Sequence, residues 1–169
     1  MAGPDAEQAI EELYRTHGLG LVRFALLLVG DQPTAEDVVQ EAFIGLYRGW
    51  HRVQDPGNVL AYLRSSVLNG CRSALRSRGR RLALQQRAAW HDPPVWSAEA
   101  AVIDGEDRRA VLAAVACLPR RQREVLALKF YLGLDEQEVA TVLRISRGAV
   151  SATAARAVAS LTRQLREQQ

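Results

Sequence analysis

One stretch of the chain combines side chains that are suited to binding nucleic acid. Between positions 58 and 80, polar residues recur every three to four positions, which places them on one face of a helix. An aromatic ring such as Tyr62 can stack on an unpaired base, amides can read base edges, and guanidinium groups can neutralise phosphates. The alternative is an ordinary solvated helix face with Tyr62 packed at its edge. The face comprises Asn58, Tyr62, Ser65, Asn69, Arg72, Arg76 and Arg80.

Charge is divided into blocks along the 169 residues. The net charge is +3, but residues 1–55 carry −5, residues 56–91 carry seven arginines and no acid, and residues 92–169 carry +1. A long basic stretch without a compensating acid favours a nucleic-acid partner, and an acidic block suits a basic protein partner. The basic residues are 21 Arg and one Lys, Lys129. A GC-rich coding sequence would account for part of this excess of Arg over Lys.

Several classes of protein are excluded by the sequence pattern. The longest apolar run, over residues 19–29, is interrupted by Arg23 and is too short to cross a bilayer, and the acidic N-terminus is no secretory signal. Cys71 and Cys117 lack zinc or disulfide spacing, so we expect no metal and a reducing, cytoplasmic compartment. P-loop and HExxH motifs are absent. We therefore expect no enzyme, no catalytic residue and no cofactor.

The elements that position these side chains are helices. The hydrophobic periodicity predicts an all-α fold, with two small helical domains joined by a flexible linker. We expect the first domain over residues 6–82, the linker over 83–105 and the second domain over 106–167. The linker holds Trp90 and Trp96, which either pack against a neighbouring domain or become ordered on a partner.

An amphipathic helix precedes the basic stretch. We predict that it starts after Thr34, with Asp37 completing a capping box, and that its apolar positions continue to Trp50. The opposite side of this helix is an acidic stripe. The stripe comprises Glu36, Asp37, Gln40 and Glu41.

The C-terminal part predicts a helix-turn-helix. Helices are expected over residues 106–118 and 120–131, and Asp135 begins a short helix with Glu138 in the position of a capping box. A three-residue turn follows, and Ser146 caps the next helix, whose N-terminal part would enter the major groove of DNA. A plain helical hairpin is the alternative. The buried side of the last helix is expected to hold Val150, Ala154, Ala157, Val158 and Leu161.

Four segments resemble the motifs of one protein family in their residues, in their order along the chain and in their spacing. Residues 31–43 resemble region 2.2 of the extracytoplasmic-function (ECF) sigma factors, which are group IV of the sigma-70 family, and residues 61–73 resemble regions 2.3 and 2.4. Residues 118–125 and 145–150 resemble region 4. Within this family, the segments most resemble those of the actinobacterial sigma-E-like subgroup.

The resemblance implies a sigma factor that binds core RNA polymerase and directs promoter-specific initiation. It would recognise the −10 and −35 elements and help to melt DNA, with the loop over residues 53–58 capturing a flipped base. The implied partners are the β′ clamp helices and β flap of polymerase, promoter DNA and a possible anti-sigma factor, without membrane insertion. The implied polymerase contacts are Glu36, Asp37, Gln40, Glu41, Phe43 and Ile44. The implied −10 contacts are Asn58, Tyr62, Asn69, Arg72, Arg76 and Arg80, and the implied −35 contacts are Arg144, Arg147, Ser151, Ala152, Thr153 and Arg156.

The chain departs from the family pattern at several positions. Arg144 stands in the turn where the family usually has Gly, at a modest strain cost, and Ser73 replaces a usual aspartate. Ser151 and Thr153 stand where Lys and Arg are usual. This exchange removes positive charges that would bind phosphate, but it permits methyl contacts with thymine. We therefore expect binding of the −10 element to follow the usual family pattern more closely than recognition of the −35 element does. A stand-alone helix-turn-helix regulator and a degenerate sigma factor that titrates an anti-sigma factor remain alternatives.

Overall fold

The computed structural model describes residues 4–52, 56–86 and 106–167, and all regular structure in those ranges is helical. The predicted all-α class is therefore confirmed. The chain divides into two compact units, Met1–Val95 and Trp96–Gln169. The predicted boundaries of the two domains and the linker stay predictions, although helix continues for four residues past position 82. Trp90 and Trp96 lie outside the described residues.

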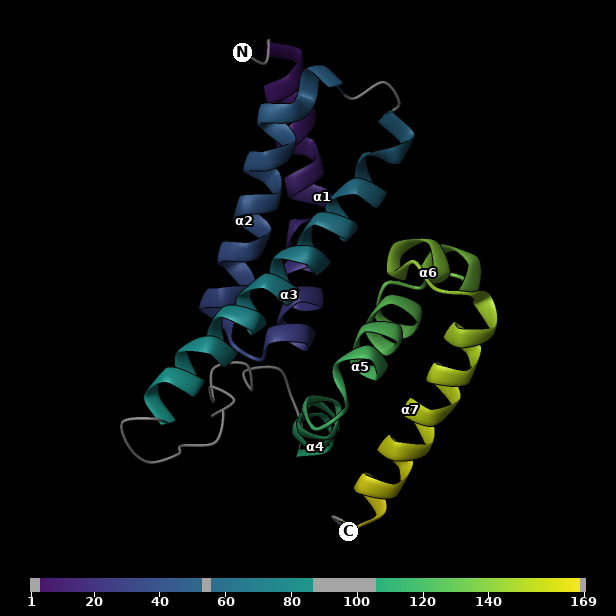
Figure 1. Cartoon of the computed structure of the whole chain (residues 1–169). Coiled ribbons are helices and arrows are strands. Elements are labelled where there is room, and N and C mark those ends of the chain that lie inside the picture. Colours follow the sequence, from purple (N-terminus) through teal and green to yellow (C-terminus); the bar gives the residue numbers. More distant parts are fainter. Residues whose placement is uncertain (1–3, 53–55, 87–105, 168–169) are drawn as a thin grey trace. The chain divides into compact units, whose positions relative to one another are not determined.

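Unit 1 is a bundle of α1 (Pro4–Val29), α2 (Gln32–Gly49) and α3 (Val59–Gln86), with short 3-10 turns at Trp50–Arg52 and Pro56–Asn58 (Figure 1). Each helix contributes one apolar stripe to a shared core, and burying each large side chain stabilises the fold by about 1.5–3 kcal/mol. Cys71 is buried, which suits a small side chain of apolar character. The core includes Phe24, Leu28, Val39, Leu46, Leu63, Val67 and Cys71.

The turn between α1 and α2 is built by two residues. Gly30 has a φ of 85°, a conformation that side chains disfavour, and so ends α1. Asp31 is the N-cap of α2, and its side chain accepts a hydrogen bond of 3.0 Å from the backbone N–H of Thr34. The predicted capping box beginning at Thr34 was therefore wrong. The helix begins two residues earlier than Thr34, because Pro33 is compatible with a first helical turn.

α2 and α3 approach each other closely at Gly70. A Cβ atom added there would lie 2.7 Å from Cγ1 of Val38, closer than side chains pack. Glycine at this position therefore sets the distance between the two helices.

Unit 2 contains α4 (Glu106–Ala116), α5 (Arg120–Leu126), a π-helical segment (Ala127–Tyr131), α6 (Glu136–Leu143) and α7 (Arg147–Glu167). The helix expected over 120–131 is thus helical throughout, but its last five residues are π-helical. Val158 was predicted to be buried and is 44% exposed, because it lies at the edge of the apolar stripe of α7. The core includes Leu118, Val125, Leu128, Val139, Val150 and Ala157.

The junction between α4 and α5 is stabilised by charged side chains. The guanidinium of Arg123 donates hydrogen bonds to the carbonyl oxygens of Ala116 and Leu118, where α4 ends. A cation suits this place because the last carbonyls of a helix carry partial negative charge. Glu124 is almost fully buried, and it ion-pairs with Arg120 and Arg121 at 3.7 and 3.3 Å.

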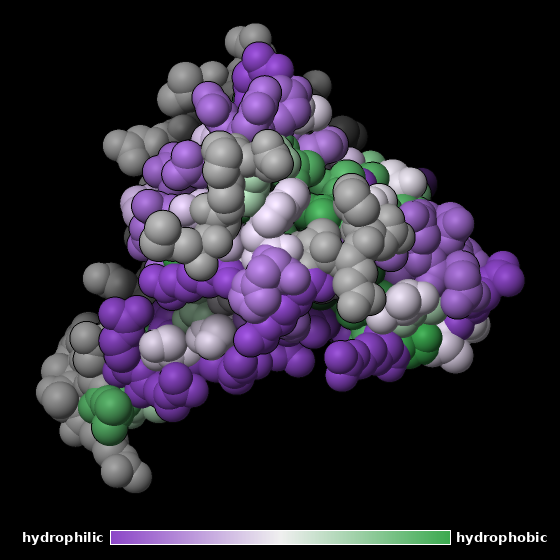
Figure 2. Space-filling view, turned by 90° about the horizontal axis from the view of Figure 1, so that it is seen from above, coloured by the Kyte–Doolittle hydropathy of each residue, from purple (hydrophilic) through white to green (hydrophobic). Residues whose placement is uncertain are grey.

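One view of the surface shows how polar and apolar side chains are distributed. On the face seen in Figure 2, hydrophilic side chains cover most of the described area and hydrophobic ones show in smaller areas between them. Within residues 4–52, 56–86 and 106–167, no helix is long and apolar enough to cross a membrane. The same ranges hold no group of three or more His, Cys, Asp or Glu side chains that could bind a metal ion.

Candidate protein and nucleic-acid interfaces

The predicted polymerase contacts lie on α2, which borders a groove on each side. The groove between α1 and α2 has a volume of about 840 Å³. Polar and apolar side chains both line it. The residues from α2 that line it are Gln32, Glu36, Gln40, Phe43, Ile44 and Tyr47.

Phe43 was predicted as a direct contact, but it is only 6% exposed. Its ring packs edge-to-face against Tyr14, with 5.1 Å between ring centroids. Tyr14 is 55% exposed, and it lies against Gly18 one turn further along α1. Phe43 therefore supports an exposed aromatic residue that the sequence analysis missed. The signal in the sequence was the pair Tyr14 and Gly18, since a ring can cover a glycine four residues away.

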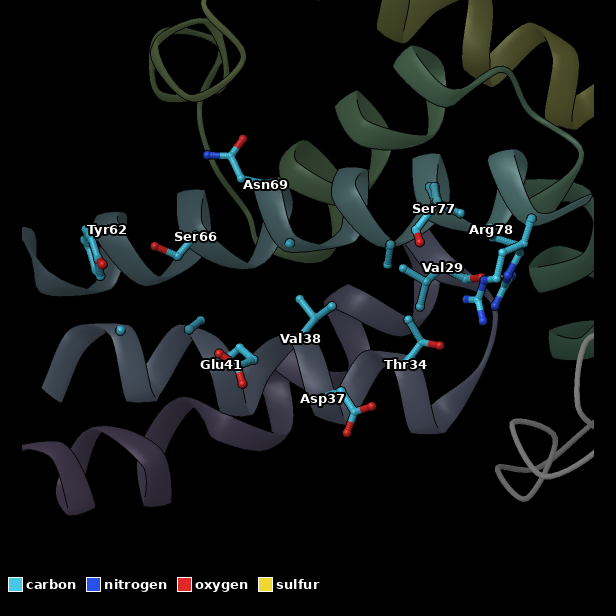
Figure 3. A pocket seen from close by; sticks show the side chains of 16 residues that line it. Val29, Thr34, Asp37, Val38, Glu41, Tyr62, Ser66, Asn69, Ser77 and Arg78 are labelled. Carbon is cyan, nitrogen blue, oxygen red and sulfur yellow. The ribbon is translucent and has the colours of Figure 1, made fainter. Parts of the chain in front are cut away.

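The second groove, about 660 Å³ in volume, lies between α2 and α3. Figure 3 shows Glu41 of α2 across from Tyr62 and Ser66 of α3, while the amide of Asn69 points away from α2. Asp37 lines the same groove. The acidic stripe that the sequence predicted as one set is thus divided between two grooves.

Five of the predicted −10 contacts lie along α3, and Asn58 lies in the 3-10 turn just before it. Five of the six are exposed, and Arg72 is half-buried. Residues 53–55 of the predicted base-capturing loop lie outside the described residues, and Asn58 at its end is exposed. The exposed members are Asn58, Tyr62, Asn69, Arg76 and Arg80.

Arg78 belongs to the same basic stretch, but its guanidinium contacts the turn between α1 and α2. Its guanidinium donates a hydrogen bond of 3.2 Å to the carbonyl oxygen of Val29, the last residue of α1, and pairs with the carboxylate of Asp31. Burial raises the pKa of Asp31, but hydrogen bonds from Thr34 and Arg78 outweigh burial and bring that pKa below its ordinary value. Arg78 therefore fastens α3 to the α1–α2 turn.

The helix-turn-helix forms as predicted. Asp135 caps α6 in a capping box with Glu138, and Ser146 caps α7 by accepting a hydrogen bond of 3.1 Å from the backbone N–H of Ala149. Arg144 adopts the left-handed conformation, with φ 54° and ψ 51°. The side chain in this turn is therefore held in a conformation that L-residues disfavour.

The exposed face of α7 carries small residues between two arginines. Arg147, Ser151, Ala152 and Arg156 are exposed, as is Arg144 in the turn. Thr153 was placed among the −35 contacts, but it is 6% exposed and lies on the apolar side of the helix. Its hydroxyl accepts a hydrogen bond of 3.3 Å from Arg156. The burial of Thr153 removes it from the DNA-facing set.

A charged pair beside this face escaped the sequence analysis. Lys129 Nζ lies 2.7 Å from Oε1 of Glu136, the first residue of α6. The hydrogen bond and charge of Lys129 lower the pKa of Glu136, and the charge of Arg147 and a hydrogen bond from Ser151 lower it further. The ion pair joins the π-helical segment to α6, and no pattern within either element indicates it.

Together, the two units define a class of DNA-binding transcription proteins, and family comparisons agree. The sigma-70 region 2 family matches residues 13–81, and the sigma-70 region 4 family matches residues 108–161. These matches cover more than half of the chain.

Individual relatives are similar over most of the chain. The ECF RNA polymerase sigma factor SigL of Mycobacterium tuberculosis is 31% identical over 166 residues, covering 96% of this chain and 92% of that protein. The RNA polymerase sigma-E factor of Streptomyces coelicolor is 29% identical over 155 residues, covering 92% and 85%. The probable sigma factor RfaY of Xanthomonas campestris is 33% identical over 149 residues, which cover 83% of this chain but only 36% of that longer protein.

A solved structure shares the fold. The sigma factor RpoE of Bartonella quintana, in complex with the anti-sigma factor NepR, matches with a TM-score of 0.74 and 21% identity, covering 94% of this chain and 99% of that one. The chain belongs to the sigma-70 family as an ECF sigma factor. It functions in transcription initiation, and its two domains are those through which sigma factors bind core RNA polymerase and promoter DNA.

Proposed function

We propose that unit 1 holds polymerase and promoter DNA on neighbouring helices. The observation that supports this proposal is the packing of α2 against α3, where Asp37 and Glu41 of α2 border the same groove as Tyr62 and Asn69 of α3. α2 would dock on the β′ clamp helices, because its exposed acids complement a basic partner. The proposed contacts are Tyr14, Glu36, Asp37, Gln40, Glu41 and Ile44, with Phe43 supporting Tyr14.

The outer face of α3 would engage the −10 element. Tyr62 would stack on an unpaired base, Asn58 and Asn69 would contact base edges, and Arg76 and Arg80 would neutralise phosphates, joined by Arg72. Capturing an unstacked base in this way would favour strand opening. The protein itself would break no bond, because polymerase supplies the chemistry.

Unit 2 would read the −35 element in duplex form. The N-terminal half of α7 would enter the major groove, with Arg147 contacting bases or phosphates and Ser151 and Ala152 allowing close approach. Arg144 and Arg156 would flank this contact. The helices before the helix-turn-helix would bind the β flap.

We further propose a cytoplasmic location and control by an anti-sigma factor. The support for control is that the Bartonella relative in the matching structure is bound to an anti-sigma factor.

Run-off transcription tests the whole assignment. Purified core polymerase should start at defined promoters only when this chain is added, and sequencing of the transcripts should reveal shared upstream elements. Absence of a defined start site would refute promoter-directing activity. Tight, sequence-specific duplex binding without polymerase would instead favour the stand-alone regulator.

A further inference from the structure

The side chain of Tyr62 reaches from α3 toward the backbone of α2. Figure 3 shows its ring pointing across the groove between the two helices, and both Tyr62 and Gly45 of α2 line this groove. A Cβ atom added to Gly45 would lie 3.7 Å from the hydroxyl oxygen of Tyr62. The ring therefore belongs to α3, but α2 bounds the space at its tip.

The backbone of α2 gives no reason for a glycine at position 45. A glycine inside a helix is less stable than an alanine, and Gly45 lies inside α2. Among the described residues, the glycines with a positive φ are Gly30 and Gly133, so Gly45 has no conformation that requires glycine. The neighbour that a side chain at position 45 would meet is Tyr62. The space that Gly45 leaves for this ring is therefore the structural reason for the glycine.

A ring that is held in place before binding loses less conformational freedom when a base stacks on it. Tyr62 is 48% exposed, so part of its ring remains open to a stacking partner. We propose that Gly45 is a positioning residue for Tyr62. By leaving space on α2 for the hydroxyl group, it keeps the ring across the groove and ready to stack on an unpaired base. This inference rests on the proposed stacking of Tyr62 in the −10 element.

Gly45→Leu tests the inference in the full chain bound to core polymerase. Leucine favours a helix, but its side chain would compete with the ring of Tyr62 for the same space. Binding would be measured to a promoter fragment that carries one unpaired base in its −10 element. Tyr62→Ala should weaken this binding by about fivefold or more, the scale of one base stacked on an aromatic ring. Gly45→Leu should weaken it by about two- to twelvefold, the cost of ordering one free side chain.

A double variant distinguishes positioning of the ring from any other effect of the leucine. Once Tyr62→Ala has removed the ring, adding Gly45→Leu should change binding by less than about twofold, the limit for independent sites. A purely structural role of Gly45 would give the same loss whether the ring is present or absent. That result would refute the proposal.

Two further variants serve as controls. Gly45→Ala adds a methyl group in ordinary contact with the hydroxyl and should bind the fragment as wild type does. Gly49→Leu adds the same side chain to the same helix, at a position with open space, and should also bind as wild type does. All variants should bind labelled core polymerase equally. A loss in Gly45→Leu that follows weaker polymerase binding would overturn the positioning role.

The failures of the two proposals are distinguishable. If Tyr62→Ala weakens binding of the fragment and Gly45→Leu does not, the role of Gly45 is refuted while the stacking of Tyr62 stands. If Tyr62→Ala has no effect, both proposals fall.

Discussion

Arg78 of α3 pairs with Asp31, the residue that caps α2, and the same guanidinium binds the last carbonyl of α1. One side chain therefore joins the ends of two helices to the C-terminal half of a third. The basic stretch that the sequence predicts as a DNA-binding region thus contains a structural arginine among exposed ones.

Arg78→Gln should lower the stability of the chain by about 1 kcal/mol, because it removes a partly exposed ion pair and a helix-end contact. Promoter binding by the holoenzyme should keep its salt dependence, since the guanidinium of Arg78 is engaged by Val29 and Asp31. Arg76→Gln is the matched control, and it should reduce the salt slope by about one while leaving stability unchanged. Urea titration and filter binding at several salt concentrations measure the two effects. Equal salt slopes for both variants would contradict the division of roles.

Stability should fall in acid partly through Asp31. Its pKa is lower in the folded chain than its ordinary value of 3.8, so the folded state favours the charged carboxylate. The stabilisation is present above the ordinary pKa and is lost as the pH falls toward the folded pKa. Asp31→Asn should therefore be less stable than wild type at pH 7, and the difference should shrink below about pH 4. A difference independent of pH in urea titrations would show that the charge of Asp31 contributes nothing.

Gly70→Ala should destabilise the chain by about 1–2 kcal/mol, because the stiff, β-branched Val38 cannot easily move from the added methyl group. Val38→Ala combined with Gly70→Ala should recover much of the loss. Gly79→Ala, in the same helix but with open space around it, should be neutral or stabilising by up to about 1 kcal/mol. If Gly70→Ala behaves like Gly79→Ala in thermal unfolding, the close approach of α2 and α3 is not a constraint.

Replacing Asp37 and Glu41 by Arg should weaken core polymerase binding by tenfold or more, since about 1.4 kcal/mol corresponds to tenfold and two contacts reverse sign. Helicity should be unchanged, because both side chains are exposed. The same change at Glu7 and Glu11, exposed on α1, controls for net charge. Binding of labelled chain to immobilised polymerase measures the effect. Unchanged affinity would exclude these two acids from the interface and leave the α1–α2 groove as the docking site.

Two substitutions of Arg144 distinguish its effect on stability from its effect on DNA binding. Arg144→Gly should raise stability by about 1 kcal/mol, because glycine adopts a positive φ without the steric cost that a side chain incurs. Arg144→Ala removes the same charge but keeps the cost. Both variants should weaken promoter binding equally if the guanidinium contacts DNA, and only the Gly variant should unfold at a higher temperature. Full promoter affinity in both variants would remove Arg144 from the DNA interface.

Short sequence patterns predicted the parts of the fold that depend on interactions between residues close together in the chain. The caps at Asp135 and Ser146 were predictable, because a capping side chain binds backbone groups only two or three residues away. The cap of α2 was misplaced because Asp31 and Thr34 are both good capping residues, and the sequence does not say which one the tertiary structure favours.

Contacts between elements could not be predicted in the same way. Thr153 is adjacent to the apolar stripe of α7, and only packing against the rest of unit 2 decides whether an edge position is buried. The ring pair of Tyr14 and Phe43 and the ion pair of Lys129 and Glu136 join separate elements. Periodicity along one helix carries no information about such partners.

The pairing of Lys129 with Glu136 has a practical consequence, because the sequence contains no second lysine. Reductive methylation with a carbon-13 reagent would give a single ε-dimethylamine resonance, distinct from that of the α-amino group. Its chemical shift would report directly on the surroundings of α6, the first helix of the helix-turn-helix. A spectrum of the intact chain could therefore follow promoter engagement by unit 2 without any engineered label.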